Sequence, residues 1–292
     1  LSATYIPSIA ANSLFLKNQD LYFASQDRIF KLDSIEKFHT IAAIPGYVDN
    51  FELDGNKLAV QSFRRSYFST DLGLTWAIDS LPQDTANNIS YWNKVKLHNN
   101  LFYLITNYQI FSDLVKIRSA VAYSADGINW VRDSLHFSAV TNLFGLNSMG
   151  FSGDTLFIGN ANGVIQYNKI QRSFTPLNHG ITENRIRALA TNSTYHLVLD
   201  RLSLTLKNRQ TGVESDIGPF LPTDRNWDAY QLSLTETNKI YFGVLDQNIG
   251  AALQKLYVSH DLGLTWSIVN SYVIDFFATN DSLFYITDKK YF

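Results

Sequence analysis

The chain contains no cysteine among its 292 residues, which excludes disulfides, thiolate metal sites and cysteine nucleophiles. This absence does not identify the compartment, because a chain without cysteine suits either redox environment. Methionine occurs once and glutamate at only five positions, so we expect few helices. The five glutamates are Glu36, Glu52, Glu183, Glu214 and Glu236.

An excess of charge of either sign is also missing. The 24 lysines and arginines nearly balance the 26 aspartates and glutamates, and no block of like charge occurs. A protein that grips a phosphate backbone needs a basic surface, so we predict no nucleic-acid partner. No apolar run approaches the roughly 18 residues that a membrane-spanning helix needs, so we predict no transmembrane segment. Residues 1–9 lack the pattern of a signal peptide, and we expect that any leader has been removed.

The sequence motifs of several common active sites are absent as well. The chain has no Gly-x-Gly-x-x-Gly, no P-loop, no His-Glu-x-x-His and no Gly-x-Ser-x-Gly. The six histidines are scattered without the spacing of metal ligands, and no Asp-rich loop has a calcium-binding pattern. We therefore predict no cofactor and no metal site. A histidine inside a strand, such as His196, is expected to be a satisfied core residue.

What the chain does contain is an abundance of aromatic residues, with 16 Tyr, 20 Phe and 5 Trp. Short runs of aromatic and β-branched residues recur along the whole length and are broken every few positions by Asn, Asp, Gly and Ser. This alternation is typical of short strands joined by tight turns. The sequence therefore predicts an all-β fold.

One unit recurs seven times: an apolar strand, a turn rich in Asn, Asp and Gly, and a second apolar strand. Because about 40 to 45 residues hold the four strands of one propeller blade, the repeat predicts a seven-bladed β-propeller. A six-bladed propeller and a β-sandwich are the alternatives. The second strands of the seven units begin at Leu21, Leu58, Leu101, Leu156, Tyr195, Ile240 and Leu283.

The seventh unit is cut short, since only Asp288–Phe292 follow its second strand. Residues 1–9 precede the first unit and include the strand-like segment Ala3–Ile6. An open ring of blades would leave two unpaired strand edges. We therefore predict that the N-terminal segment supplies an outer strand of the last blade, and that residues 1–292 form a single domain.

Three turns between the predicted third and fourth strands share a sharper pattern. Residues 69–76 read Ser-Thr-Asp-Leu-Gly-Leu-Thr-Trp, residues 259–266 read Ser-His-Asp-Leu-Gly-Leu-Thr-Trp, and residues 124–130 form a copy one residue shorter. In each turn the Asp is suited to accept hydrogen bonds from turn amides, the Gly to adopt a positive φ, and the Trp to bury apolar surface. The positions concerned are Ser69, Asp71, Gly73 and Trp76; Ser124, Asp126, Gly127 and Trp130; and Ser259, Asp261, Gly263 and Trp266.

These turns resemble the Asp-box, or bacterial neuraminidase repeat, of a family of β-propellers that includes uncharacterised exported proteins of Bacteroidetes. The resemblance implies that the boxes are structural and lie on the face away from the functional centre. The alternative is that Asp71, Asp126 and Asp261 bind a metal or a substrate.

The same family includes sialidases, so a sialidase-type glycoside hydrolase is the alternative function. Such an enzyme has an Arg-Ile-Pro motif ahead of its first box, whereas here the nearest candidate, Phe63-Arg64-Arg65, lacks the proline. Of the five glutamates, only Glu183 falls on a segment expected to reach the face opposite the boxes. The spacing of two catalytic carboxylates, which separates retaining from inverting glycosidases, cannot be read from a sequence. The sequence therefore leaves enzymatic activity undecided and favours a protein without it.

Ligand recognition is predicted on loops opposite the boxes, namely residues 82–93, 105–119, 176–185, 219–230 and 243–254. Several of these loops combine arginine with aromatic residues, which offer apolar contact area at small entropic cost. The alternative for Trp92 and Trp227 is packing between blades. The candidate ligand-binding residues are Arg64, Arg65, Tyr91, Trp92, Tyr108, Arg185, Arg225, Trp227 and Tyr230.

Asp-Ser or Asp-Thr followed by a small or apolar residue occurs six times, as in residues 133–135 and 281–283. It resembles the O-glycosylation motif of exported Bacteroidetes proteins, although Asp-Ser is also common turn chemistry. With the family resemblance, it favours a bacterial protein of the periplasm or cell surface, anchored by a lipid through a removed N-terminus. The function predicted from the sequence is an extracytoplasmic, non-catalytic binding or scaffold module for a glycan or a partner protein. The ligand and the oligomeric state stay open.

Overall fold

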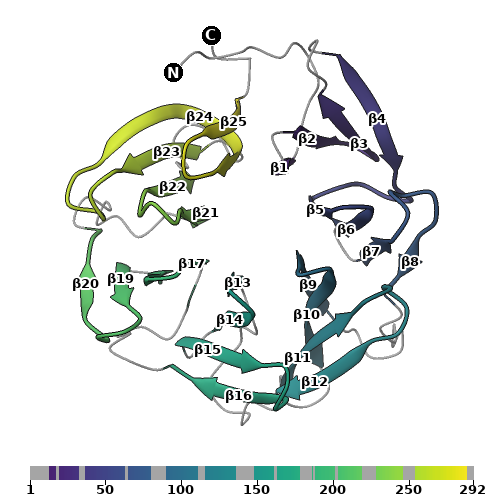
Figure 1. The fold of residues 1–292 in the computed structure, drawn as a ribbon, viewed down its shortest axis with the longest axis horizontal. Coiled ribbons are helices and arrows are strands. Elements are labelled where there is room, and N and C mark those ends of the chain that lie inside the picture. The colour runs from purple at the N-terminus through teal and green to yellow at the C-terminus, as the bar shows by residue number, and fades with distance from the viewer. Residues whose placement is uncertain are drawn as a thin grey trace. The chain divides into compact units, whose positions relative to one another are not determined.

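The structure is a computed structural model, and its described part consists entirely of strands joined by turns (Figure 1). The all-β prediction is confirmed. The described residues are 13–17, 20–32, 37–62, 65–79, 90–110, 116–135, 148–160, 163–177, 186, 188–200, 203–218, 228–245 and 254–287.

The strands form six antiparallel sheets in which sequence neighbours pair. Sheets one to three comprise β1 (Ser13–Lys17), β2 (Asp20–Ser25), β3 (Arg28–Leu32) and β4 (Phe38–Ala43); β5 (Asn50–Asp54), β6 (Lys57–Ser62), β7 (Arg65–Ser69) and β8 (Ala77–Ile78); and β9 (Ser90–His98), β10 (Leu101–Ile110), β11 (Lys116–Ser124) and β12 (Val131–Leu135). Sheets four to six comprise β13 (Ser148–Ser152), β14 (Thr155–Asn160), β15 (Gly163–Asn168) and β16 (Ser173–Pro176); β17 (Ala188–Thr191), β18 (Tyr195–Leu199), β19 (Leu204–Asn208) and β20 (Glu214–Asp216); and β21 (Asp228–Leu234), β22 (Ile240–Leu245), β23 (Gln254–Ser259), β24 (Ser267–Ala278) and β25 (Leu283–Thr287).

All seven predicted strand-turn-strand units are present as hairpins, but they belong to six sheets and not seven. The seventh unit, β24 with β25, continues the sixth sheet, which therefore has five strands. The prediction of seven blades is wrong, and the six-blade alternative is confirmed. Residues 1–9, which we predict to supply a closing strand, lie outside the described residues, so that closure stays a prediction.

The merging of the seventh hairpin with the sixth sheet has a local cause in the sequence. The first half of β24 pairs with β23, for example Ser267 opposite Val258, and its second half pairs with β25. Each of the five earlier connections between units contains a glycine or a proline, as at Pro45-Gly46, whereas residues 267–278 contain neither. Without a residue that ends a strand, the chain runs through from one unit to the next.

Short turns of suitable chemistry join β5 to β6 and β9 to β10. The turn between β5 and β6 has Gly55 at φ 58°, and the turn between β9 and β10 has Asn99 and Asn100 at φ 47° and 61°. Two successive positive φ values define the type I′ turn, whose twist matches that of the paired strands. The Asn99–Asn100 turn therefore suits the pairing of β9 with β10, and Gly55 allows the tight turn between β5 and β6.

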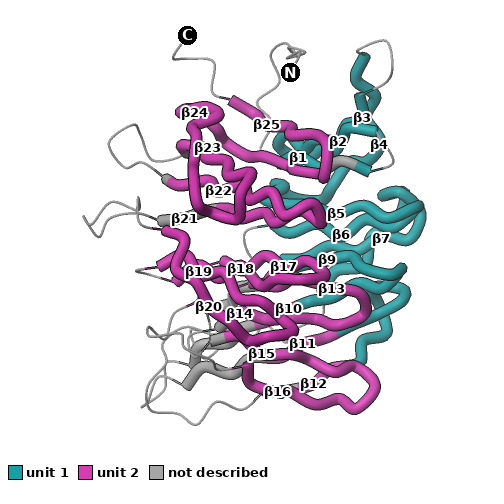
Figure 2. The backbone as a smooth tube through the Cα atoms, turned by 60° about the vertical axis from the view of Figure 1, so that its left-hand side comes forward, with its two compact units in different colours: residues 1–82, 95–104, 123–131 teal, residues 83–94, 105–122, 132–292 magenta. Residues whose placement is uncertain are grey.

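The chain divides into two compact units (Figure 2). Unit 1 holds residues 1–82, 95–104 and 123–131, and unit 2 holds residues 83–94, 105–122 and 132–292. Sheets one and two belong to unit 1, sheets four to six belong to unit 2, and the strands of sheet three are divided between the units.

Within each unit, the core lies between neighbouring sheets. In unit 1, residues of the first sheet such as Ile29 pack with Phe51 and Val60 of the second. In unit 2, leucines of the fifth sheet such as Leu197 pack with Phe242 of the sixth. Face-to-face packing of successive sheets buries apolar side chains on both faces of an inner sheet, so inner strands read as continuous apolar runs.

The first hairpins of successive sheets are also joined by hydrogen bonds, and the two partners lie about one sequence repeat apart. In unit 1, Ser13 Oγ donates to Asn50 Oδ1 at 3.1 Å, 37 residues away. In unit 2, Asn192 Nδ2 donates to the carbonyl of Thr235 at 2.8 Å, 43 residues away. Polar residues of the strands and turns thus join one hairpin to the next.

Candidate functional site

The three turns that resemble the Asp-box, called box turns below, connect third and fourth strands: β7 to β8, β11 to β12, and β23 to β24. In the first of them, Asp71 Oδ1 accepts from the amide of Thr75 at 2.9 Å and Asp71 Oδ2 from its hydroxyl at 2.6 Å. Ser69 Oγ donates to Asp71 Oδ1 at 2.7 Å and accepts from the amide of Gly73 at 2.7 Å. One carboxylate and one hydroxyl therefore hold both halves of the turn.

The turn at residues 259–266 repeats this pattern, with Asp261 Oδ1 accepting from the amide of Thr265 at 2.9 Å. The shorter copy differs, because Asp126 Oδ1 accepts from the amides of Ile128 and Asn129, both at 2.8 Å. Asn129 Nδ2 also donates to Asp126 Oδ2 at 2.7 Å, in place of the threonine hydroxyl.

These hydrogen bonds lower the pKa of the box aspartates, because they stabilise the carboxylate form. The pKa of Asp71 falls to about 2, mainly through the hydroxyl and the amide of Thr75. The pKa of Asp261 also falls to about 2, through the same groups of Thr265. That of Asp126 is held well below its ordinary value, mainly by the amides of Asn129 and Ile128. All the recorded partners of these carboxylates lie within their own turns.

The box glycines have positive φ and lie against the preceding sheet. A Cβ atom on Gly73, at φ 83°, would come within 2.6 Å of Ala42 Cβ. A Cβ on Gly263, at φ 89°, would meet Ile217 Cβ at 2.5 Å, and one on Gly127 would meet Phe68 Cβ at 2.5 Å. Both the conformation and the lack of space therefore require glycine at these positions.

The box tryptophans are half-buried, and none of their rings is fully buried. Trp76 Nε1 donates to the carbonyl of Ala43 in the preceding sheet at 2.9 Å, and its ring meets Tyr67 edge-on. Trp266 Nε1 donates to the carbonyls of Gly263 at 3.0 Å and Ile217 at 3.3 Å. Each of these two boxes thus fastens its own sheet to the one before it.

Of the predicted ligand-binding residues, the structure describes one side chain, that of Arg65, which is exposed at the start of β7. Four others lie on strands. Part of the loop predicted at residues 105–119 is in fact strand, because residues 101–110 form β10 and residues 116–124 form β11. Tyr91 and Trp92 are on β9, Tyr108 on β10 and Tyr230 on β21. The remaining four, Arg64, Arg185, Arg225 and Trp227, lie outside the described residues.

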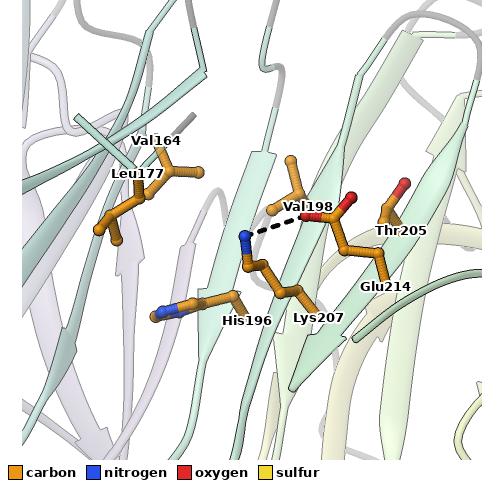
Figure 3. Close-up of a pocket in the computed structure, with 7 residues that line it drawn as sticks. All are labelled: Val164, Leu177, His196, Val198, Thr205, Lys207 and Glu214. Atoms are coloured by element: carbon orange, nitrogen blue, oxygen red, sulfur yellow. Dashed lines mark ion pairs between the residues drawn. The ribbon is translucent and has the colours of Figure 1, made fainter. Parts of the chain in front are cut away.

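A small cavity in unit 2 brings together residues that the sequence did not single out (Figure 3). Its floor is the face of sheet five, where His196 of β18 is paired with Lys207 of β19, and Lys207 with Glu214 of β20. Because these three residues are cross-strand neighbours, their side chains form one row on one face. The other residues lining the cavity are Val198 and Thr205 of sheet five, Val164 of sheet four and Leu177, which follows β16.

The polar atoms of this row are incompletely satisfied. Lys207 Nζ lies 3.0 Å from Glu214 Oε1, an ion pair whose two atoms are not aligned for a hydrogen bond. Both atoms and His196 Nδ1 are buried without a hydrogen-bond partner. His196 was expected to be a satisfied core residue, and this expectation is wrong for Nδ1.

The surroundings of His196 favour its neutral form. Its ring packs against Phe157 with 4.4 Å between centroids, and the Arg209 guanidinium lies 5.2 Å from the centroid of the same Phe157. Burial, followed by the positive charges of Arg209 and Lys207, lowers the pKa of His196 to about 4. The imidazole is therefore uncharged at neutral pH.

The cavity has a volume of about 20 Å³, which suits one water molecule with three polar partners. A sugar or a peptide side chain does not fit it, so it is not a substrate pocket. The described residues hold no group of three or more His, Cys, Asp or Glu side chains arranged to bind a metal ion. They also include no helix that is long and apolar enough to cross a membrane.

The described glutamates are engaged with neighbouring side chains or amides. Glu52 pairs with Lys96 and accepts from the amide of Leu97 at 3.1 Å. Glu236 Oε2 accepts from Ser193 Oγ at 2.7 Å, in the turn network at the box end of the sheets. Glu183, the glutamate expected on the opposite face, lies outside the described residues.

Comparison with solved structures identifies the fold class as a β-propeller. The WD40 propeller domain of Doa1 aligns with a TM-score of 0.62 over 97% of this chain and 91% of its own, at 10% identity. BamB from Moraxella catarrhalis aligns with a TM-score of 0.58 over 96% and 83%, also at 10% identity. The GH74 enzyme from Niastella koreensis aligns with a TM-score of 0.57 and 14% identity over 88% of this chain, which spans 45% of that enzyme.

At such low identities these likenesses establish the fold alone, which unrelated functions share. No protein-family model matches the sequence, and no curated protein is significantly similar to it. The chain is thus a β-propeller whose described residues form six sheets. Membership of the Asp-box family stays a prediction.

Proposed function

We propose that this protein is a non-catalytic binding module of the bacterial periplasm or cell surface. Its ligand is a glycan or a partner protein, and recognition takes place at the ends of the sheets remote from the box turns. The proposal rests on one observation: the polar side chains at the box end are engaged in hydrogen bonds within the protein.

At the box end, polar side chains donate hydrogen bonds to turns of their own sheet or of the neighbouring sheet. Arg209 Nη1 donates to the carbonyl of Asn192 at 2.8 Å and to Ser152 Oγ, while Lys239 Nζ donates to the carbonyl of Asn280 at 2.6 Å. In unit 1, Lys57 Nζ donates to the carbonyls of Asn100 and Ala125. Side chains committed to such contacts are poorly placed to change partners when a ligand arrives.

The composition of the opposite loops supports the same assignment. Residues 219–230 contain two prolines, which limit the conformations of the backbone, and place Arg225 two residues from Trp227. Tryptophan and arginine are enriched among the residues that contribute most to binding. The exposed Arg65 lies at the β6–β7 end, on the side of the sheets opposite the box turns.

The assignment to the periplasm or cell surface, with a lipid anchor upstream, rests on the Asp-Ser and Asp-Thr motifs and the Asp-box resemblance. Fractionation of the native organism tests it directly. Recovery of the protein with membranes or the cell exterior agrees with the proposal, and recovery with the cytosol contradicts it.

The function is tested by a glycan-array screen and a capture of protein partners, run beside a panel of fluorogenic glycosides. Binding without turnover is the expected result, and hydrolysis of any glycoside would favour the sialidase-type alternative. Arg64→Ala and Arg225→Ala are expected to weaken binding at least tenfold, about 1.4 kcal/mol, with little change in melting temperature. Arg132→Ala, which replaces a half-buried arginine of β12, is the matched control and should bind normally.

A further inference from the structure

The row of His196, Lys207 and Glu214 lies where an apolar surface would be the ordinary choice. Sheets four and five pack through a cluster of Phe157, Val164, Ile186, Leu189 and Val198, with Leu177 against it. An ion pair with side-chain exposures of 14% and 22% borders this cluster, although desolvation of two charges is costly.

We propose that this row is a proton-sensitive joint: the contact between sheets four and five is closed while His196 is neutral and opens when His196 is protonated. The proposal stands on the cavity and the register: the imidazole packs against Phe157 of sheet four, and Lys207 is its cross-strand neighbour within sheet five.

The charges around His196 decide the direction of the response. On the side of sheet four, the described residues that touch the imidazole or line the cavity are apolar, namely Phe157, Val164 and Leu177. β19 presents Lys207, the turn after β19 presents Arg209, and β20 presents Glu214, which already pairs with Lys207. A proton on His196 would add a positive charge to two others opposed by one carboxylate, in a place with room for one water molecule.

The size of the response follows from the pKa values. With a pKa of about 4 in the closed state and 6.5 once the histidine is exposed, the stability of the contact is complete above about pH 6.5 and decreases as the pH falls towards 4. The ratio of open to closed molecules is then expected to rise about 30-fold at pH 5, against less than twofold at pH 7.5.

Hydrogen exchange, corrected for the intrinsic effect of pH on amide exchange, measures this opening. Amides of β14 and β18 should lose protection about 30-fold between pH 7.5 and pH 5. Amides of β22, which packs on the other, apolar face of sheet five, serve as the internal reference and should change little. Equal loss of protection in β14 and β22 would overturn the proposal.

Two variants and one titration complete the test. His196→Phe should abolish the acid response of β14, whereas His260→Gln, which alters an exposed histidine, should retain it. An acid response that persists in His196→Phe would contradict the proposal. Because that variant could fail to fold, the imidazole of the wild-type protein is also titrated by NMR: a midpoint near 4 supports the joint, and one near 6.5 overturns it. Lys207→Met should raise the midpoint, a shift that a purely structural role would not produce.

Discussion

Sheet five has two buried faces, and they are built differently. The face towards sheet six presents Leu197, Leu199, Leu204 and Leu206, each at most 6% exposed, to the apolar side chains of β22. The face towards sheet four presents His196, Lys207 and Glu214 beside Val198. Because side chains alternate between faces along a strand, the same strands β18 and β19 supply both surfaces. Sheet five thus combines one apolar face with one that holds a polar row.

The largest expected effect comes from damage to the apolar face. Leu197→Ala removes a fully buried side chain and leaves a cavity, so it should lower the free energy of unfolding by about 3 to 5 kcal/mol. Chemical denaturation measures this loss. A cost below about 1 kcal/mol would show that the face towards sheet six is not the stabilising one.

The polar face is expected to respond to single and double substitutions in opposite ways. Lys207→Ala leaves the half-buried Glu214 unpaired, and should cost about 2 to 3 kcal/mol. The double variant Lys207→Met with Glu214→Leu replaces the ion pair by apolar side chains. Its free energy of unfolding should lie within about 1 kcal/mol of the wild-type value. A double variant as unstable as the single one would mean that the ion pair itself stabilises the contact.

The box turns provide a smaller effect at a half-buried position. Trp76→Ala removes a half-buried ring and its hydrogen bond to the carbonyl of Ala43. This change should lower the free energy of unfolding by about 1.5 to 2.5 kcal/mol. Thermal and chemical melts measure it. A variant as stable as the wild type would show that the box tryptophan does not fasten its sheet to the preceding one.

The smallest effect is the pH dependence of a box turn. Since the pKa of Asp71 is about 2 in the folded state and 3.8 without its partners, its contribution to stability is present above about pH 3.8 and is lost as the pH falls to 2. The melting temperature of Asp71→Asn should therefore lie below that of the wild type at pH 5 and approach it near pH 2. A difference in melting temperature that stays constant over this range would show that ionisation of Asp71 does not stabilise the turn.

Much of the fold could be predicted from the sequence because its signals are local. An apolar run, an Asn or Gly turn and a second apolar run specify a hairpin within about 15 residues. The number of blades was predicted wrongly, because residues 267–278 form one strand where the other units are separated. The absence of glycine and proline from that segment was the available signal.

The polar row could not be predicted, because its residues meet only through strand pairing. His196, Lys207 and Glu214 are 11 and 7 residues apart along the chain, and the pairing registers of three strands put them on one face. A shift of one residue would have sent each side chain to the opposite face. The predicted binding loops rest on composition alone and stay a prediction.

We propose that ligand recognition and folding use opposite ends of the sheets, and two tryptophan variants measured side by side test this claim. For each variant, affinity for the ligand found in the screen and melting temperature are determined on the same preparation. Trp227→Ala should lose at least tenfold in affinity at an unchanged melting temperature, and Trp130→Ala should lower the melting temperature and keep its affinity once folded. A Trp227→Ala variant that melts early and binds normally would contradict the claim, because Trp227 would then belong to the packing between sheets.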